Sequence, residues 1–503
     1  MIDRFSEELF LTIETGKMLY HKYAEHMPII DYHCHLQPVE IAENKEFEDL
    51  GEMWLRGDHY KWRCMRTFGI DEKYITGDAS YYEKYMKFAE ILPQLVGNPI
   101  YIWCALELKR YFDIDEPLTA ANAQEIYDRT KKLITEKHMT RRWCMEHSNV
   151  RLVSTTEDPI DDLRYHKVLN EEKMFTRVIT AFRPDKAMFC ANADFAAYLA
   201  KLSAAAEQPI DSFAEMLTAL EKRLQYFQQI TEQPFDSFAE MLTALEMRLQ
   251  YFQQITGTSV SDDGIPYFNW ADYTPAEVEG IFAKARSGGK LTQHEIDQYQ
   301  SAFLFEMARI YNRNHYVMQL HIGTYLDANT SHVKSVGQST GFDCCDDAAP
   351  VKGVGELLNN LTTIGELPKT IIYPLDGTKI ETWAISKIET WAILAAGFCD
   401  TGTKAKVQLG APWWFNDQAF GIQRQFEACA NLYPVSLSVG MLTDSRSFIS
   451  YPRHELYRRV LCSYLGSLVE RGEYFSGEEE LKKTIENVCF NNVNEFFGFN
   501  VKV

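Results

Sequence analysis

The sequence lacks several features that would place the protein in a membrane or in an oxidising compartment. It has no apolar run near the roughly 18 residues that a membrane span needs, and no CxxC spacing. Its 11 cysteines are scattered except for Cys344-Cys345, which favours reduced thiols over a disulfide framework or a zinc knuckle. The first residues have neither the basic start nor the small-residue cleavage site of a signal peptide. We therefore expect a cytoplasmic protein without a membrane partner.

Positive charge is also scarce. The 503 residues include 51 Lys+Arg against 71 Asp+Glu, a formal net charge of −20, and no Lys/Arg-rich run occurs. Such a chain repels phosphate backbones, so we expect no nucleic-acid partner. A hydrophobic share of 46% with 13% aromatic residues is enough for a sizeable core. The composition predicts a large, soluble, acidic globular protein.

Two tandem near-duplications occupy residues 208–257 and 379–394. Residues 208–232 are repeated with three changes as 233–257, and the eight residues 379–386 are repeated with one change as 387–394. Each longer copy has a capping-box pattern and one apolar face, which predicts a helix in each, with Pro234 between the two. Two copies cannot bury a continuous repeat core. We interpret both duplications as insertions without a catalytic role.

Seven apolar runs each end in polar or aromatic residues, as the buried parallel strands of a barrel do. An eighth, weaker candidate is 257–265. This pattern predicts a single (β/α)8-barrel domain over residues 1–503, with helical insertions at about 40–147 and 187–303. The seven runs are 27–36, 150–159, 178–185, 317–323, 369–376, 406–414 and 436–446.

Three histidines lie where such strands end. His33 and His35 follow the first run, and alternation along a strand puts residues i and i+2 on the same side, where both can bind one divalent metal ion. The alternative is a pair of ordinary polar or packing histidines. His321 ends another run and is a third metal ligand, a substrate contact or a structural residue.

Asp444 and Arg446 follow the last run. An aspartate there can bind a metal or accept a proton, and Arg446 projects to the same side, where it stabilises the carboxylate or binds an anionic substrate. The alternative is a surface Asp/Arg pair. The polar side chains of the adjoining residues 447–455 favour the functional interpretation.

Six motifs resemble those of the uronate isomerase family, also called glucuronate isomerase, in the amidohydrolase superfamily. The resemblance runs from the first predicted helix to the C-terminus, and the last motif matches over sixteen consecutive residues. It implies a distorted (β/α)8 TIM-type barrel that interconverts D-glucuronate with D-fructuronate and D-galacturonate with D-tagaturonate. The motifs are DYHCHL (31–36), WLRGDHYKWRCMR (54–66), AFRPD (181–185), LHIG (320–323), APWWFND (411–417) and GMLTDSRSFISYPRHE (440–455).

The resemblance also implies roles for individual residues. The metal ligands would be His33, His35 and Asp444, and Asp444 would also be the catalytic base. The sugar site would contain His59 and Tyr60, which the sequence pattern alone would place on an amphipathic helix face. The substrate carboxylate or carbonyl would contact Arg183 and Arg446. His321 is kept as a substrate contact.

One departure from the family pattern limits what the resemblance assigns. The family usually has Asp-His before the glycine where this chain reads Ser261-Asp262-Asp263-Gly264, so we assign no role to that turn. The predicted strands do not end in a lysine that could bridge a pair of metal ions. This favours a single divalent ion, for which we expect Zn²⁺. The partner would be a small sugar acid, a hexuronate, and a homo-oligomer is left open.

Aldose-ketose isomerisation needs a group that moves a proton between C2 and C1, a group that stabilises an enediolate oxygen, and donors that open the ring. Asp444 suits the proton transfer, and Arg446 or a metal suits the stabilisation of the enediolate. His59 and Tyr60 suit the opening of the ring. One rival is a metal-dependent hydrolase on the same barrel, in which Asp444 deprotonates a water. The other is an inactive barrel that binds sugar acids. Arg183 and Arg446 favour an acid sugar as substrate.

Overall fold

The computed structural model describes residues 4–206, 235–346, 350–375 and 387–502. Its strands form two parallel sheets and one antiparallel pair. The three-stranded sheet is β1 (Ile29–Asp31), β2 (Val150–Glu157) and β3 (Arg177–Phe182), in that order. The four-stranded sheet is β4 (Asp263–Ile265), β5 (Met318–Ile322), β8 (Thr370–Pro374) and β9 (Val407–Leu409). The antiparallel pair is β6 (Thr324–Tyr325) and β7 (Cys344–Cys345).

The two parallel sheets are continuous at one edge. Phe182 at the end of β3 pairs with Ser261 just before β4 in a parallel bridge, and the Phe182 amide donates to the Val260 carbonyl at 2.9 Å. The apolar runs that predicted these strands are almost fully buried, as parallel strands covered on both faces must be. Six of the seven predicted strands, and the weaker candidate at 257–265, are thereby confirmed.

The prediction of a strand at 436–446 is wrong. Val435–Leu437 is a 3₁₀ turn, and the rest of this segment has no regular secondary structure. Gly440 and Asp444 have φ values of +75° and +45°, which interrupt an extended strand. The segment still runs beside the end of β1, because the Asp444 amide donates to the His33 carbonyl and the His35 amide to the Ser445 carbonyl.

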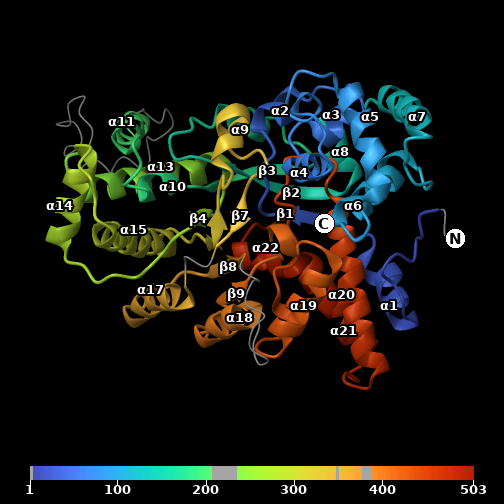
Figure 1. The fold of residues 1–503 in the computed structure, drawn as a ribbon. Coiled ribbons are helices and arrows are strands. Elements are labelled where there is room, and N and C mark those ends of the chain that lie inside the picture. Colours follow the sequence, from blue (N-terminus) through green and yellow to red (C-terminus); the bar gives the residue numbers. More distant parts are fainter. Residues whose placement is uncertain (1–3, 207–234, 347–349, 376–386, 503) are drawn as a thin grey trace.

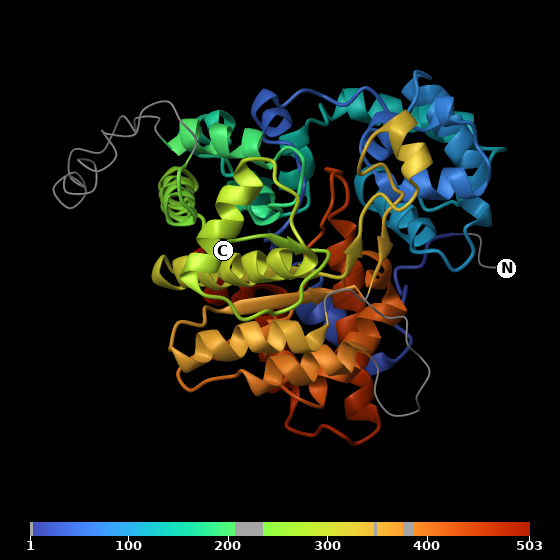
Figure 2. The same ribbon diagram turned by 60° about the vertical axis from the view of Figure 1, so that its left-hand side comes forward.

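Helices surround the sheets on several sides (Figures 1 and 2). Those between β1 and β2 gather on one side, those between β3 and β5 on the opposite side, and α17 to α19 lie next to one another below the strands in Figure 1. The first helices are α1 (Glu14–Leu19), α2 (Pro38–Glu43), α3 (Leu50–Leu55), α4 (His59–Thr67), α5 (Tyr81–Ile91), α6 (Pro99–Phe112), α7 (Ala123–Glu136), α8 (Arg141–His147) and α9 (Arg164–Glu171). They are followed by α10 (Asp185–Met188), α11 (Phe195–Ala206), α13 (Phe238–Thr256), α14 (Pro275–Arg286), α15 (Gln293–Arg313) and α16 (Thr330–Val336). The last are α17 (Val351–Thr363), α18 (Lys387–Gly397), α19 (Ala419–Ala430), α20 (Pro452–Glu470), α21 (Glu478–Glu486) and α22 (Asn492–Phe497).

Short turns of other helix types join these elements. Tyr20–Ala24 and Asn487–Asn491 are π-helical, and Glu72–Tyr74, Leu92–Gln94 and Trp414–Asn416 are 3₁₀ turns. Among the helices of the described ranges, none combines the length and apolar character that crossing a membrane requires.

The second copy of the longer duplication forms α13. Ser237 caps it by accepting from the Glu240 amide, and Gly257 ends it with a φ of +67°, so the predicted helix start is confirmed. Its apolar face is buried against α9, α11 and β3. The first copy, Pro234 and residues 379–386 lie outside the described residues, and 387–394 are part of α18. That the chain forms one domain stays a prediction.

Candidate active site

Asp444 lies at the centre of the residues that the sequence singled out. Its Oδ1 is 3.3 Å from His33 Nε2 and 3.0 Å from His35 Nε2, and its Oδ2 accepts a 2.7 Å hydrogen bond from Trp413 Nε1. His33 is buried, the His35 side chain is 30% exposed and that of Asp444 is 10% exposed. The structure thus brings the three predicted metal ligands together. Trp413, which sequence reasoning did not assign, orients the carboxylate.

The histidines determine the charge state of this carboxylate. Burial, the largest influence, raises the pKa of Asp444, but the hydrogen bonds with His33 and His35 outweigh it and hold the pKa well below its ordinary value. Burial lowers the pKa of His35. For His33 the opposing charges of Asp262 and Asp444 outweigh burial, and its pKa is raised. At neutral pH Asp444 is therefore ionised.

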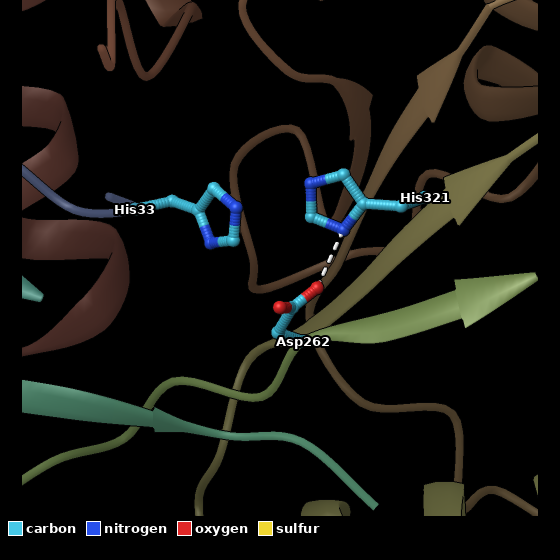
Figure 3. Close-up of side chains that lie close together, drawn as sticks. All are labelled: His33, Asp262 and His321. Carbon is cyan, nitrogen blue, oxygen red and sulfur yellow. Dashed lines mark ion pairs between the residues drawn. The ribbon is translucent and has the colours of Figure 1, made fainter. Parts of the chain in front are cut away.

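A second group of ligand atoms shares His33. His321, in β5, places Nδ1 at 2.8 Å from Asp262 Oδ1, and its ring centroid is 4.7 Å from that of His33. Figure 3 shows the two rings and the Asp262 carboxylate facing one another. The ligand atoms of these three residues lie within 4.8 Å of one another, as do those of His33, His35 and Asp444.

Asp262 was missed by the sequence analysis. It directly precedes β4, so it lies at the same sheet edge as the strand neighbour β5 that carries His321. The available signal was a pair of aspartates near the end of the weak candidate run 257–265, a pattern that is also typical of a surface turn. Asp262 is 1% exposed instead. Only the pairing of β4 with β5 identifies it as part of the site.

The donors in this region fit a divalent metal ion. His321 Nδ1 pairs with Asp262 Oδ1 at 2.8 Å, but His33 Nδ1 and His321 Nε2 are buried and have no hydrogen-bond partner among the described residues. Polar atoms left in this state are costly unless something binds them. Imidazole nitrogens with a carboxylate oxygen are the ligands of catalytic zinc sites and of related transition metals. The residues present therefore suit the ion that the sequence predicted, with Asp262 and His321 as additional ligand candidates.

Arg183 links Asp262 to a second carboxylate. Its Nη1 donates to Asp262 Oδ2 at 3.0 Å and its Nε to Asp185 Oδ2 at 2.8 Å, while 35% of its side chain stays exposed. Burial raises the pKa of Asp262, but Arg183 and His321 outweigh it and lower that pKa. Burial prevails at Asp185, whose pKa is raised to about 6 despite Arg183. The charge of Arg183 is thus partly neutralised by two carboxylates, and Arg183 lies beside the candidate metal ligand Asp262.

The first turn of α4 holds the predicted sugar contacts. Asp58 caps this helix by accepting from the amides of Tyr60 (3.0 Å) and Lys61 (3.2 Å), and the His59 and Tyr60 rings stack with centroids 4.5 Å apart. Burial and then the charge of Arg446 lower the pKa of His59 to about 3. Burial and then the charge of Asp444 raise the pKa of Tyr60. At neutral pH the imidazole and the phenol are both uncharged.

Arg446 lies between α4 and the metal ligands. It donates from Nη1 to the Ser339 carbonyl at 3.1 Å, and it lines a cavity of about 340 Å³ together with His35 and Asp58. Within the described residues Arg446 contacts no carboxylate within ion-pair distance. The cavity therefore offers a positive charge close to a histidine that contacts Asp444.

Comparisons with known proteins agree with this geometry. The family model described as glucuronate isomerase matches residues 1–236 and 228–497. The uronate isomerase of Lachnospira eligens is 40% identical, over 98% of this chain and 99% of the relative. The crystal structure of uronate isomerase from Thermotoga maritima superposes with a TM-score of 0.85 at 29% identity, and covers 98% of this chain and 99% of that one. Glucuronate isomerase from Caulobacter crescentus has the same fold, with a TM-score of 0.84 at 24% identity over 99% and 98% of the two chains.

The match extends over nearly the whole chain, and the six motifs that suggested it surround Asp444 in the folded structure. With a full-length family match and a relative of 40% identity, the chain belongs to the glucuronate isomerase family of enzymes.

Proposed function

We propose that the protein interconverts D-glucuronate with D-fructuronate and D-galacturonate with D-tagaturonate, with Asp444 as the base. The observation that carries this proposal is the position of Asp444. An ionised carboxylate contacts two histidines and an indole, next to a cavity lined by Arg446, which has no carboxylate partner among the described residues. The names of the full-length relatives support the same substrate class.

The reaction moves one proton from C2 to C1 and one from O2 to O1, and leaves the rest of the sugar unchanged. Asp444 takes the proton from C2 of the open-chain aldose, and the electron pair of the broken C–H bond forms the enediolate, with the negative charge on O1. The same proton, now on the carboxyl group, returns to C1, while the O2 hydroxyl gives its proton to O1, so that C2 becomes the ketone and O1 becomes a hydroxyl. A carboxylate of low pKa is a weak base, so this route depends on strong stabilisation of the enediolate.

Stabilisation of that charge falls to the cations beside Asp444. Arg446 can donate to an enediolate oxygen from the cavity wall. A divalent ion would be held by His33, His35 and Asp444, with Asp262 and His321 as neighbouring ligands, and it supplies positive charge next to the sugar oxygens when bound. Zinc is the ion we propose.

The substrate's own carboxylate is assigned to Arg183 and Arg446, and His321 is retained as a substrate contact. Charge-assisted, bidentate contacts favour arginine for a planar carboxylate. Because the pKa of His59 lies near 3, its imidazole is neutral and can both donate to and accept from sugar hydroxyls. Tyr60 keeps its proton and is a donor for the ring oxygen as the ring opens.

The fold that we propose for this site is a distorted (β/α)8 barrel. Seven parallel strands account for most of it, and residues 438–446 take the eighth place between β9 and β1 without forming a strand. Hydrogen bonds on both sides of this segment support that arrangement, from the Val439 amide to the Gln408 side chain and from the Asp444 amide to the His33 carbonyl. One domain and a cytoplasmic location stay predictions, and the oligomeric state is left open.

Incubation with D-glucuronate and with D-galacturonate in D₂O tests the proposal, with ketose formation followed by NMR before and after chelation. We expect ketose from both sugars and some deuterium at C1, because a proton held by Asp444 can exchange with solvent. A thermal shift with uronates but no ketose would favour the inactive sugar-binding barrel. Cleavage of an amide or ester substrate without uronate turnover would favour the hydrolase.

A further inference from the structure

The backbone at Asp444 is strained, so something must hold it. Asp444 has a φ of +45° in a segment without helix or strand, and left-handed backbone is uncommon for a residue with a side chain. The direction of its carboxylate depends on that backbone. Neighbouring contacts must therefore determine it.

Thr443, the residue before Asp444, is held at three atoms by two buried charges. Its amide donates to Asp31 Oδ1 at 2.7 Å and its hydroxyl to Asp31 Oδ2 at 2.6 Å, while its carbonyl accepts from Arg453 Nη1 at 2.9 Å. Asp31 is 0% exposed and Arg453 is 2% exposed. Hydrogen bonds to charged groups are stronger than neutral ones, and burial protects them from water.

Arg453 also contacts the opposite wall of the site. Its guanidinium carbon lies 4.0 Å from the ring centroid of Trp103 and 5.5 Å from that of Tyr60. A planar cation on these faces fixes the rings through cation-π attraction. One side chain therefore joins the segment of Asp444 to the first turn of α4, two parts of the site that are far apart in the sequence.

Buried carboxylates near Arg453 balance its positive charge. Asp417 Oδ2 is 3.6 Å from its Nη1, and the buried carboxylates of Asp58 and Glu107 lie close enough to favour its charged form, with Lys61 balancing them. A buried cation without such partners would be strongly destabilising. The neighbouring carboxylates thus keep Arg453 charged beside Thr443.

We propose that Arg453 and Asp31 are positioning residues, which clamp Thr443 from both sides and so hold the Asp444 carboxylate, with Arg453 also holding Tyr60. This inference rests on the proposed isomerisation by Asp444. Neither side chain needs to touch the substrate. Their effect is on the placement of the base, and a misplacement of about 1 Å can cost on the order of a hundredfold in rate.

The test compares Arg453→Lys with Arg459→Lys. Lysine keeps the charge but cannot bond the Thr443 carbonyl and cover two rings together. Arg459 lies in the same helix, is 0% exposed and also bonds backbone carbonyls, those of Glu7 and Leu9, away from the site. We expect Arg453→Lys to lower kcat about ten- to a hundredfold with KM within threefold, and Arg459→Lys to leave kcat within threefold at a similar loss of Tm. Equal kcat losses in the two folded variants, or none in Arg453→Lys, overturn the inference.

A double mutant separates positioning from general destabilisation. If Arg453 acts chiefly through Asp444, Arg453→Lys should lower kcat by clearly less in the Asp444→Asn background than in wild type, where only the part that depends on Tyr60 remains. Losses that multiply overturn the inference. Should Arg453→Lys not fold, Asp31→Asn takes its place, with the same expectation in both backgrounds. Wild-type protein assayed in parallel separates the proposed function from the positioning role. If the wild type forms no ketose, the proposed function is overturned. If wild type and variant have equal kcat, only the positioning role of Arg453 and Asp31 is overturned.

Discussion

Asp444 and Glu157 are both largely buried carboxylates that contact histidines, and their electrostatics are opposite. Asp444 lies next to His33 and His35, and its pKa is held well below the ordinary value. Glu157, at the end of β2, has Oε2 at 3.6 Å from His166 Nε2, yet burial raises its pKa to about 8. At neutral pH the first carboxylate is charged and the second is not.

The hydrogen-bond donors explain the difference. The pKa of Asp444 is lowered by its hydrogen bonds with His33 and His35, whereas among the described residues Glu157 accepts from the hydroxyls of Thr155 and Thr180, which do not outweigh its burial. Burial also lowers the pKa of His166 to about 4, so this histidine supplies no charge at neutral pH. A histidine beside a carboxylate is therefore not by itself a reactive pair.

The two sites also face different surroundings. His35, which contacts Asp444, lines the cavity that Arg446 shares, and the nearby His33 Nδ1 and His321 Nε2 have no hydrogen-bond partner among the described residues. Glu157 is covered by α9, the helix that carries His166. The comparison predicts that substitutions at the first site change catalysis, and that substitutions at the second change only stability.

The largest expected effect is that of Asp444→Asn, with Glu157→Gln as its isosteric match. Loss of a positioned general base should lower kcat by on the order of 10²- to 10⁴-fold, whereas the Gln variant should stay within a few-fold of wild type. Steady-state kinetics with both uronates measures this. Metal content must be determined in parallel, because a lost ion would imitate a lost base. An Asn variant that keeps its metal and isomerises normally would remove Asp444 from the role.

The second effect concerns Arg183, the cation beside the candidate metal ligand Asp262. Arg183→Met should raise KM for uronates about ten- to a hundredfold, since a charge-assisted contact is worth roughly 1.5 to 3 kcal/mol. Arg164→Met, on the exposed face of the helix that covers Glu157, should leave KM unchanged. A fall in kcat alone would assign Arg183 to the transition state instead of the bound substrate.

A third, smaller effect is on stability, and it depends on pH. Unfolded Glu157 releases its proton near 4.5, but folded Glu157 keeps it until about 8, so the free energy of unfolding falls as pH rises between these values. Each pKa unit is worth about 1.4 kcal/mol. Glu157→Gln lacks this loss, so its Tm relative to wild type should rise from pH 5 to pH 8.5. A flat difference across this range would show that Glu157 is ionised in the folded protein, and Glu146→Gln on the surface serves as control.

The smallest effect is expected from removing one duplicated copy. Deletion of residues 208–232 leaves α13 and its Gly257 end intact and should leave kcat within a few-fold. Deletion of 233–257 puts Glu232 where Gly257 has a φ of +67°, and a Cβ there would meet Arg177 Nη2 at 2.5 Å. This second deletion should lower Tm, by weakening the side of the molecule where α13 packs on α9, and still leave kcat within a few-fold. A loss of several orders of magnitude in either folded deletion would show that the segment shapes the site.

How much of the site the sequence predicted depends on how local each signal is. His33, His35, Asp444 and Arg446 stand at the ends of apolar runs, where alternation and strand direction indicate a shared face. His59 and Tyr60 depended on the resemblance to a family, because their local pattern is that of an amphipathic helix.

The sequence by itself determined six of the seven predicted strands, the capped start of α13 and the histidine pair, since apolar periodicity and capping act over a few neighbouring residues. Tertiary structure decided the rest. Asp262 enters the site only because β4 pairs with β5, and Trp413 meets Asp444 only because the chain returns beside β1. The charge state of each buried group followed the same rule, because a pKa depends on burial and on charges brought from distant parts of the chain, which no local pattern records.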